Sequence, residues 1–158
     1  MHLDRIAIVG AGMAGLAAAL SFCRFGIGCD VFEQAGELTQ VGAGLQMSPN
    51  ASAILGELGL LPELEAVWME PRQIGLASGT SLKPLAHVPA GPSARQRWGA
   101  PYGVLHRATL QAALLKAVLA HPLCTLHFGQ AVENGTADAL EQITGQRYPL
   151  IIGADGVW

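Results

Sequence analysis

The sequence is poor in charged residues, and the two signs nearly balance. Only 13% of its 158 residues are charged, and 9 Lys or Arg against 12 Asp or Glu give a net charge of −3. Proteins that bind nucleic acid or anionic membranes need positive surfaces, so the composition gives no reason to expect either partner. Hydrophobic residues make up 51% of the chain, which excludes intrinsic disorder and allows one domain with a sizeable core.

Signals for export, for membrane insertion and for metal binding are also missing. Cys23, Cys29 and Cys124 form no C-x-x-C pair, and an odd number of cysteines favours a reduced compartment. The first strand-like run begins at Arg5, which leaves no room for a signal peptide, and glycines interrupt every long apolar run. The histidines show no H-x-x-x-H spacing. We therefore expect a cytoplasmic protein without a metal site.

The first thirty-three residues have the pattern of one βαβ unit. The apolar run Ile6–Val9 is typical of a parallel strand that is buried on both faces. Residues 16–25 are predicted to form a helix that stops at Gly26, and residues 29–32 a second strand that ends at Glu33.

Three glycines with G-x-G-x-x-G spacing connect the first strand to the helix. Gly10 permits a tight turn, Gly12 lets a pyrophosphate approach the backbone, and Gly15 lets the helix pack closely on the strand. The helix N-terminus attracts phosphate, and Glu33 can accept hydrogen bonds from ribose hydroxyls. A glutamate also repels a 2′-phosphate, which argues against NADP in this cleft. The motif predicts a dinucleotide site, but does not by itself separate FAD from NAD.

The remaining chain alternates between helical and extended patterns. Residues 41–46 are a second glycine-rich stretch, which either lets the backbone approach a flat ligand or is an ordinary loop. Helices are predicted over residues 49–58, 61–68 and, with Leu110, Leu114 and Val118 on its apolar face, from about residue 107. Two strands are predicted within 73–89, a loop over 89–101, and strands at 125–128, 130–133 and 150–152.

Two charged residues stand at positions that suggest a ligand. Arg107 begins or just precedes a helix, where a cation is unfavourable unless it has an anionic partner; a solvated surface arginine is the alternative. Asp155 follows the predicted buried strand at 150–152. Because ligands bind at the carboxyl ends of strands in open α/β sheets, Asp155 is expected on the same rim as the glycine motif.

Four stretches together resemble one known family. They are "IVGAGMAGLAAALSFCRFGIGCDVFE", "GAGLQMSPNA", "GVLHRATLQAALL" and "LIIGADGVW". In this order the chain resembles the N-terminal part of FAD-dependent aromatic-ring monooxygenases, the salicylate hydroxylase-like branch of the para-hydroxybenzoate hydroxylase family. The resemblance favours FAD over NAD. It implies an α/β fold: a Rossmann-like FAD-binding βαβ fold with inserted β-strands, incomplete in this chain.

The resemblance also implies roles for single residues. The FAD pyrophosphate would be held by Gly10, Gly12, Met13, Ala14 and Gly15. The adenosine ribose would be bound by Glu33 with Gln34 beside it, and the backbone at Val132 would approach the adenine. Arg107 would reach the ribityl-pyrophosphate region, Asp155 is linked to both FAD and NAD(P)H, and residues 41–46 would lie near the isoalloxazine.

The activity implied by the resemblance is hydroxylation of a small aromatic substrate with NAD(P)H as reductant and O₂. No side chain of this chain is assigned a catalytic role. Another FAD oxidoreductase (an epoxidase, a halogenase or a ubiquinone-type hydroxylase) and a catalytically silent nucleotide-binding module remain alternatives, and no oligomeric state is implied. Family members are longer, so residues 1–158 are expected to be a truncated FAD-binding domain, with 73–101 an insertion that belongs to the substrate-side sheet.

Overall fold

The computed structural model of the chain describes residues 3–38 and 42–156. It divides into two compact units, which are described separately. Unit 1 consists of residues 1–40 and 111–158, and unit 2 of residues 41–110. Within the described residues, no helix has the length and apolar character needed to cross a membrane.

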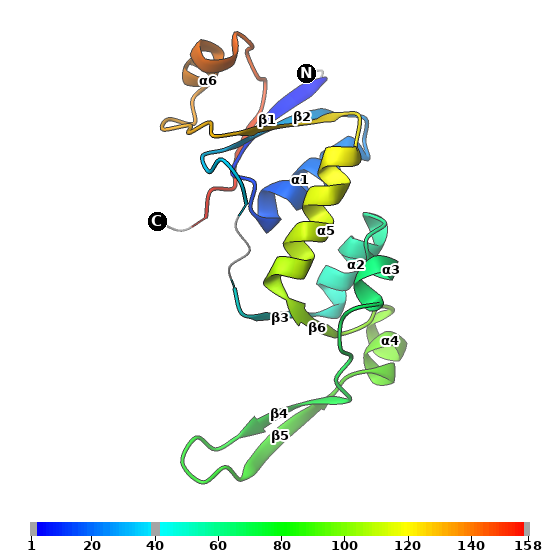
Figure 1. The fold of residues 1–158 in the computed structure, drawn as a ribbon. Coiled ribbons are helices and arrows are strands. Elements are labelled where there is room, and N and C mark those ends of the chain that lie inside the picture. Colours follow the sequence, from blue (N-terminus) through cyan, green and yellow to red (C-terminus); the bar gives the residue numbers. More distant parts are fainter. Residues whose placement is uncertain (1–2, 39–41, 157–158) are drawn as a thin grey trace. The chain divides into compact units, whose positions relative to one another are not determined.

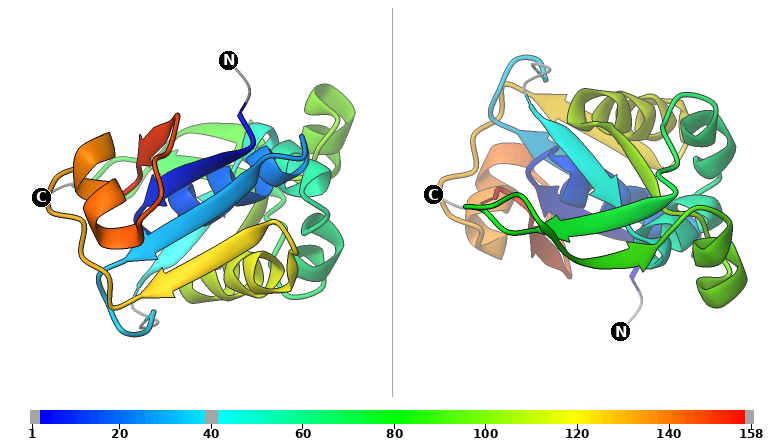
Figure 2. Two further views of the ribbon diagram at one scale, coloured as in Figure 1. Left: turned by 90° about the horizontal axis from the view of Figure 1, so that it is seen from above. Right: turned by 90° about the horizontal axis from the view of Figure 1, so that it is seen from below.

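Unit 1 is built on a parallel sheet of four strands, β1 (Arg5–Val9), β2 (Gly28–Glu33), β7 (Cys124–Phe128) and β8 (Ile151–Gly153). Their order across the sheet is β7-β2-β1-β8, and every neighbouring pair is parallel (Figures 1 and 2). The predicted α/β class and the two strands of the βαβ unit are confirmed. The strand predicted at 150–152 exists, but it is half-buried because β8 lies at the sheet edge.

Helix α1 (Met13–Cys23) connects β1 to β2 and starts earlier than predicted. Gly12 has φ −66° and ψ 178°, so it is the extended N-cap, and the helix begins with the next residue. Its apolar residues Leu16, Ala19 and Leu20 are buried. The chain then turns at Gly26, whose φ of 76° is the left-handed conformation expected after a helix.

A second helix, α6 (Ala137–Thr144), packs on a group of side chains from the sheet. Leu140 is buried against Ala7, Phe32 and Tyr148. Helix α6 was not predicted from the sequence, and the strand predicted over 130–133 is wrong, since these residues have no strand structure. The N-terminus of α6 is capped by Thr136, whose Oγ1 accepts a hydrogen bond from Ala139 N at 3.2 Å.

Unit 2 contains two small antiparallel sheets. One pairs β3 (Gly44–Met47) with β6 (Gly103–His106). Part of the glycine-rich stretch 41–46, which was interpreted as a backbone approach to a ligand or as a loop, is therefore a strand. Val41 lies outside the described residues. The other is the predicted hairpin of β4 (Gln73–Ala77) and β5 (Pro84–Pro89) (Figure 1).

The helices of unit 2 are short. They are α2 (Pro49–Glu57), α3 (Leu61–Glu65) and α4 (Pro92–Trp98). Helix α4 lies in the stretch 89–101, which was wrongly predicted to be a loop. Pro92 occupies its first turn and Gly99 ends it with φ 72°, so the residues that suggested a loop are the boundaries of a helix. Helix α3 is shorter than the predicted 61–68: it ends at Glu65 and is followed by a turn in which Val67 N and Trp68 N both donate to Leu64 O.

The long helix α5 (Arg107–Ala120) follows β6, as predicted. Arg107 is its first residue. The side chains of Leu110, Leu114 and Val118 are buried, which confirms the apolar face inferred from their spacing.

Candidate nucleotide site

The turn between β1 and α1 requires glycine at two of its three motif positions. Gly10 has φ 102°, and a Cβ there would lie 2.4 Å from the carbonyl oxygen of Ala154. A Cβ on Gly15 would lie 1.9 Å from the carbonyl oxygen of Gly10. These glycines let the turn, the helix and the segment after β8 pack backbone against backbone. Their presence is therefore explained by the fold alone.

Gly12 is different, because the protein itself leaves room for a side chain. Its φ of −66° suits any residue, and the nearest atom to a Cβ there is the carbonyl oxygen of Ala154 at 3.9 Å. Gly12 lines an open cleft, and no side chain caps the N-terminus of α1, which begins with Met13 and Ala14. This bare backbone, with the helix dipole behind it, fits a pyrophosphate.

The carboxylate of Glu33 holds the backbone around this turn. Its Oε2 accepts a hydrogen bond from Ala11 N at 2.9 Å, and its Oε1 accepts one from Ala35 N at 2.9 Å. Glu33 thus joins the end of β2 to the middle of the glycine motif. With Gln34, it also lines the cleft.

The cleft has a volume of about 360 Å³ and lies entirely within unit 1. Its lining residues come from the carboxyl ends of all four strands and from α5: Val9, Gly10, Gly12, Phe32, Glu33, Gln34, Leu38, Gln111, Gln130, Val132, Ala154, Asp155 and Gly156. Asp155 is therefore on the same rim as the glycine motif, as the strand-end rule predicted. A bond of 2.7 Å from Ala154 N to Val9 O fixes this neighbourhood.

Some lining residues were missed by the sequence analysis. Gln130 is the second residue after β7, so applying the strand-end rule to this third strand would have found it. Gln111 lies on α5, and nothing in its sequence context marks it as a cleft residue. Val132 does line the cleft, although it lies in a loop and not in the predicted strand.

Arg107 belongs to unit 2, where it lies beside the second glycine-rich stretch. A Cβ on Gly42 would be 2.8 Å from Cδ of Arg107, and Gly42 has φ 153°. Arg107 N donates a hydrogen bond to Ala43 O at 3.2 Å. Its side chain is exposed. The anionic partner of this cation stays a prediction.

The comparisons with known proteins identify the cofactor of the domain. Residues 4–158 match the family described as FAD binding domain. The chain belongs to this FAD-binding family. FAD is thus the cofactor of the domain, and the ambiguity between FAD and NAD in the glycine motif is resolved.

Several relatives of this FAD-binding domain are named as monooxygenases or oxygenases. It is 39% identical to 3-amino-4-hydroxybenzoate 2-monooxygenase of Streptomyces cremeus, over 97% of this chain and 40% of that protein. It resembles a tetrameric form of 2-methyl-3-hydroxypyridine-5-carboxylic acid oxygenase with a TM-score of 0.76 and 24% identity, over 99% of this chain and 40% of that one, which shows the fold. HpxO of Klebsiella pneumoniae, solved with FAD and uric acid, matches with a TM-score of 0.66 and 26% identity, over 82% of this chain and 32% of that one. The chain spans about 40% of the length of the curated relative.

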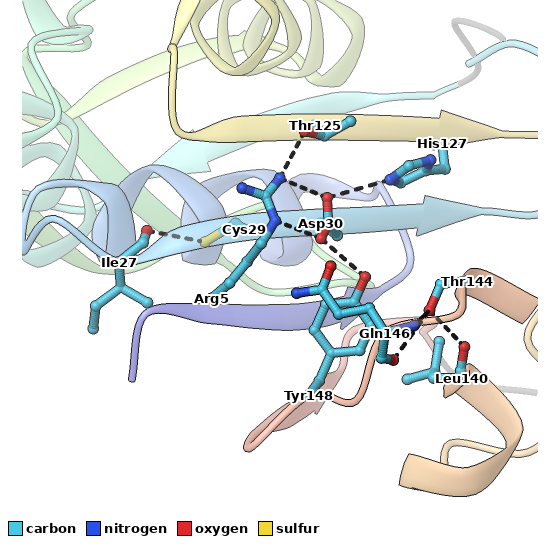
Figure 3. A network of polar contacts seen from close by, with 10 residues as sticks. All are labelled: Arg5, Ile27, Cys29, Asp30, Thr125, His127, Leu140, Thr144, Gln146 and Tyr148. Carbon is cyan, nitrogen blue, oxygen red and sulfur yellow. Dashed lines mark hydrogen bonds and ion pairs between the residues drawn. The ribbon is translucent and has the colours of Figure 1, made fainter. Parts of the chain in front are cut away.

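A polar network on one face of the FAD-binding sheet holds β1, β2 and β7 together (Figure 3). Asp30 lies at its centre and is buried. Arg5 donates to both carboxylate oxygens, at 2.6 and 2.7 Å, and also to Thr125 Oγ1 at 2.7 Å. The hydroxyl of Tyr148 donates to Asp30 at 2.9 Å, and His127 Nε2 lies 3.3 Å from the carboxylate.

The network determines the ionisation of its members. Burial by itself would raise the pKa of Asp30, but hydrogen bonds from Arg5, Tyr148 and His127 outweigh it, and the net pKa is lowered. Burial, together with the bond to Asp30, raises the pKa of Tyr148 to about 12. Asp30 is therefore an ionised structural group, and it does not line the cleft.

Proposed function

We propose that this chain is the FAD-binding portion of a flavoprotein monooxygenase that hydroxylates a small aromatic substrate with NAD(P)H and O₂. The observation that carries the proposal is the cleft at Gly12, where the protein itself would leave room for a side chain. The chain also matches the FAD-binding family over residues 4–158. The relative at 39% identity, named as a 3-amino-4-hydroxybenzoate 2-monooxygenase, supports the substrate class.

In this proposal the pyrophosphate of FAD lies over the N-terminus of α1. Its ligands are backbone N–H groups of the motif, from Gly10, Gly12, Met13, Ala14 and Gly15. The missing side chain at Gly12 and the uncapped helix end support this placement.

The adenosine end of FAD is proposed to lie between the ends of β2 and β7. Glu33 and Gln34 contact the ribose, the backbone at Val132 approaches the adenine, and Asp155 contacts the middle of the cofactor. All four line the same cleft, which supports their assignment to one ligand. Glu33 already accepts a bond from the motif, so it can orient both the turn and the ribose.

Unit 2 is proposed to serve the flavin end and the substrate. Arg107 supplies a positive charge for the ribityl-pyrophosphate region, and the stretch after residue 41 faces the isoalloxazine. Residues 73–101 belong to the substrate-side sheet; the hairpin exposes Leu76, Leu85 and Val88 by 61%, 64% and 51%, which supports a further protein layer over it. NAD(P)H is the reductant.

The chemistry is supplied by the bound FAD, which accepts electrons from NAD(P)H and reacts with O₂. The residues of this chain bind the pyrophosphate, orient the ribose and keep the cofactor in place. None of them is proposed to act as an acid, base or nucleophile.

The first test is the absorbance spectrum of the purified chain before and after incubation with FAD and desalting. Retained flavin absorbance supports the cofactor assignment. A chain extended to the length of its relatives should also retain FAD, oxidise NAD(P)H and yield a hydroxylated product with 3-amino-4-hydroxybenzoate or a related aromatic acid.

The two readouts separate the alternatives. Flavin retention by the longer chain without NAD(P)H oxidation would favour a silent nucleotide-binding module. NAD(P)H oxidation with an epoxide or a halogenated product would favour another class of FAD oxidoreductase. If neither chain retained flavin, the proposal would be wrong.

A further inference from the structure

Three side chains that can bind a metal meet at the far end of α1 from the glycine motif. Cys23 is the last residue of α1, Cys124 is the first residue of β7, and His121 lies just before β7. One ligand atom from each lies within 4.8 Å of the other two, and the two Sγ atoms are 3.2 Å apart. All three residues belong to unit 1. The group does not touch the nucleotide cleft.

The turn that carries two of these ligands is held by backbone bonds. Cys124 N donates to His121 O at 3.0 Å, which closes a four-residue turn with Pro122 at its second position, where proline is favoured. Cys29 N donates to Leu123 O at 2.9 Å and so ties the turn to β2. The spacing H-x-x-C therefore presents both ligands from a fixed backbone.

The imidazole of His121 is oriented by a weak bond. Leu123 N donates to its Nδ1 at 3.3 Å, which is long for a hydrogen bond. A metal ion at this nitrogen would replace one weak bond. Both His121 and Cys124 are half-buried, so an ion can enter from solvent, whereas Cys23 is buried with 4% exposure.

Distances favour a shared metal ion over a disulfide. Two thiolates on one tetrahedral Zn²⁺, each about 2.3 Å from the ion, lie roughly 3.8 Å apart. A disulfide requires about 2.05 Å. The two Sγ atoms are 3.2 Å apart. The separation that would let them share one Zn²⁺ ion is therefore roughly half as large as the approach that a disulfide would require.

We propose that Cys23, His121 and Cys124 bind one Zn²⁺ ion, with a water molecule as the fourth ligand. Two thiolates and one imidazole are a ligand set that Zn²⁺ prefers. The two thiol protons pass to the buffer, and two thiolates balance the charge of the ion. This site is separate from FAD binding. The ion links the end of α1 to the edge strand β7. This proposal departs from the expectation of no metal site, which was based on the spacing between histidines.

The test is equilibrium dialysis of the reduced, chelator-treated chain against Zn²⁺, followed by metal analysis. We expect one Zn²⁺ per chain. Cys23→Ser and Cys124→Ser should each weaken binding by roughly 100-fold or more, and His121→Asn by at least tenfold, since loss of even an outer-shell partner costs about 10–100-fold. X-ray absorption at the zinc edge should show two sulfur ligands and one imidazole in the unmutated chain.

A matched variant serves as a control. His87→Asn removes an exposed histidine of β5 that lies outside the group. It should bind Zn²⁺ like the unmutated chain, and circular dichroism checks that every variant is folded.

Three results would overturn the proposal. One is the absence of stoichiometric Zn²⁺ in the folded, reduced chain. Another is a zinc spectrum without two sulfur ligands, a measurement that needs no variant. The third is conversion of Cys23 and Cys124 to a disulfide, with loss of two hydrogens by mass, under reducing conditions that keep Cys29 as a thiol.

Discussion

Replacing Gly12 with Ala should separate FAD binding from folding. In the folded chain, Gly12 has an ordinary backbone conformation, and a Cβ there meets nothing closer than 3.9 Å. Alanine is a poorer N-cap than glycine by about 0.5–1 kcal/mol. This loss is offset by about 0.4–1 kcal/mol from the less flexible unfolded chain. The free energy of unfolding should therefore change by no more than about 0.5 kcal/mol.

The same methyl group lies in the cleft where the pyrophosphate is proposed to bind. We expect Gly12→Ala to weaken FAD binding at least tenfold, which corresponds to about 1.4 kcal/mol. Gly36→Ala is the matched control, since Gly36 is exposed, lies outside the cleft, and a Cβ there meets nothing within 4 Å. It should leave FAD affinity unchanged and raise the free energy of unfolding by about 0.4–1 kcal/mol, through the less flexible unfolded chain alone.

Gly15→Ala, in contrast to Gly12→Ala, should destabilise the fold itself. Its Cβ would lie 1.9 Å from Gly10 O, whereas non-bonded heavy atoms need about 3.5 Å. The helix must shift from β1, which should cost at least about 3 kcal/mol in unfolding free energy. Urea denaturation and FAD titration followed by flavin fluorescence measure both quantities. If Gly12→Ala bound FAD like the unmutated chain, or unfolded as easily as Gly15→Ala, the assignment of Gly12 to the pyrophosphate would be refuted.

Three further predictions concern stability. The pKa of Asp30 is lowered in the folded chain, so the contribution of Asp30 to stability is present above its ordinary pKa of about 3.9 and is lost as the pH falls through its pKa in the folded chain. Urea midpoints should therefore drop below about pH 4, and Asp30→Asn should weaken this acid dependence. Gly103→Ala should cost about 2–3 kcal/mol, because a Cβ there would lie 2.3 Å from the Trp68 ring; an unchanged midpoint in tryptophan fluorescence would contradict it. Glu33→Gln should lower the free energy of unfolding, measured by thermal denaturation, by about 1 kcal/mol, because the carboxylate that accepts from Ala11 N loses its charge. It should also weaken FAD binding, and an equal FAD affinity would count against the ribose assignment.

Local patterns predicted the elements whose signals are contained in a short stretch. The apolar run at Ile6–Val9, the glycines after it and the spacing of Leu114 and Val118 each identified their element correctly. Predictions failed where a boundary signal was taken for the content of a segment. Pro92 and Gly99 suggested a loop, although they begin and end α4.

The candidate site likewise has features that local sequence predicts and features that depend on long-range packing. From the sequence alone came the G-x-G-x-x-G turn, the acid after the second strand and the expectation that Asp155 shares their rim, because the strand-end rule applies to every parallel strand. The motif predicted a turn role for Gly10, a pyrophosphate role for Gly12 and a packing role for Gly15. It could not predict that the backbone at Ala154, after β8, leaves no room for a Cβ on Gly10, because this is a contact across most of the chain.

Tertiary structure alone decided which distant side chains meet. Asp30 is a buried charge with partners from two neighbouring strands and from the segment before β8, and nothing in its local sequence indicates them. Cys23 and Cys124 are separated by 101 positions and lie 3.2 Å apart, because α1 ends beside the start of β7. Local sequence determines helices, strands and turns through nearest-neighbour sterics and periodicity. The order of strands in the sheet determines which of these segments become neighbours, and this order is set by packing over the whole chain.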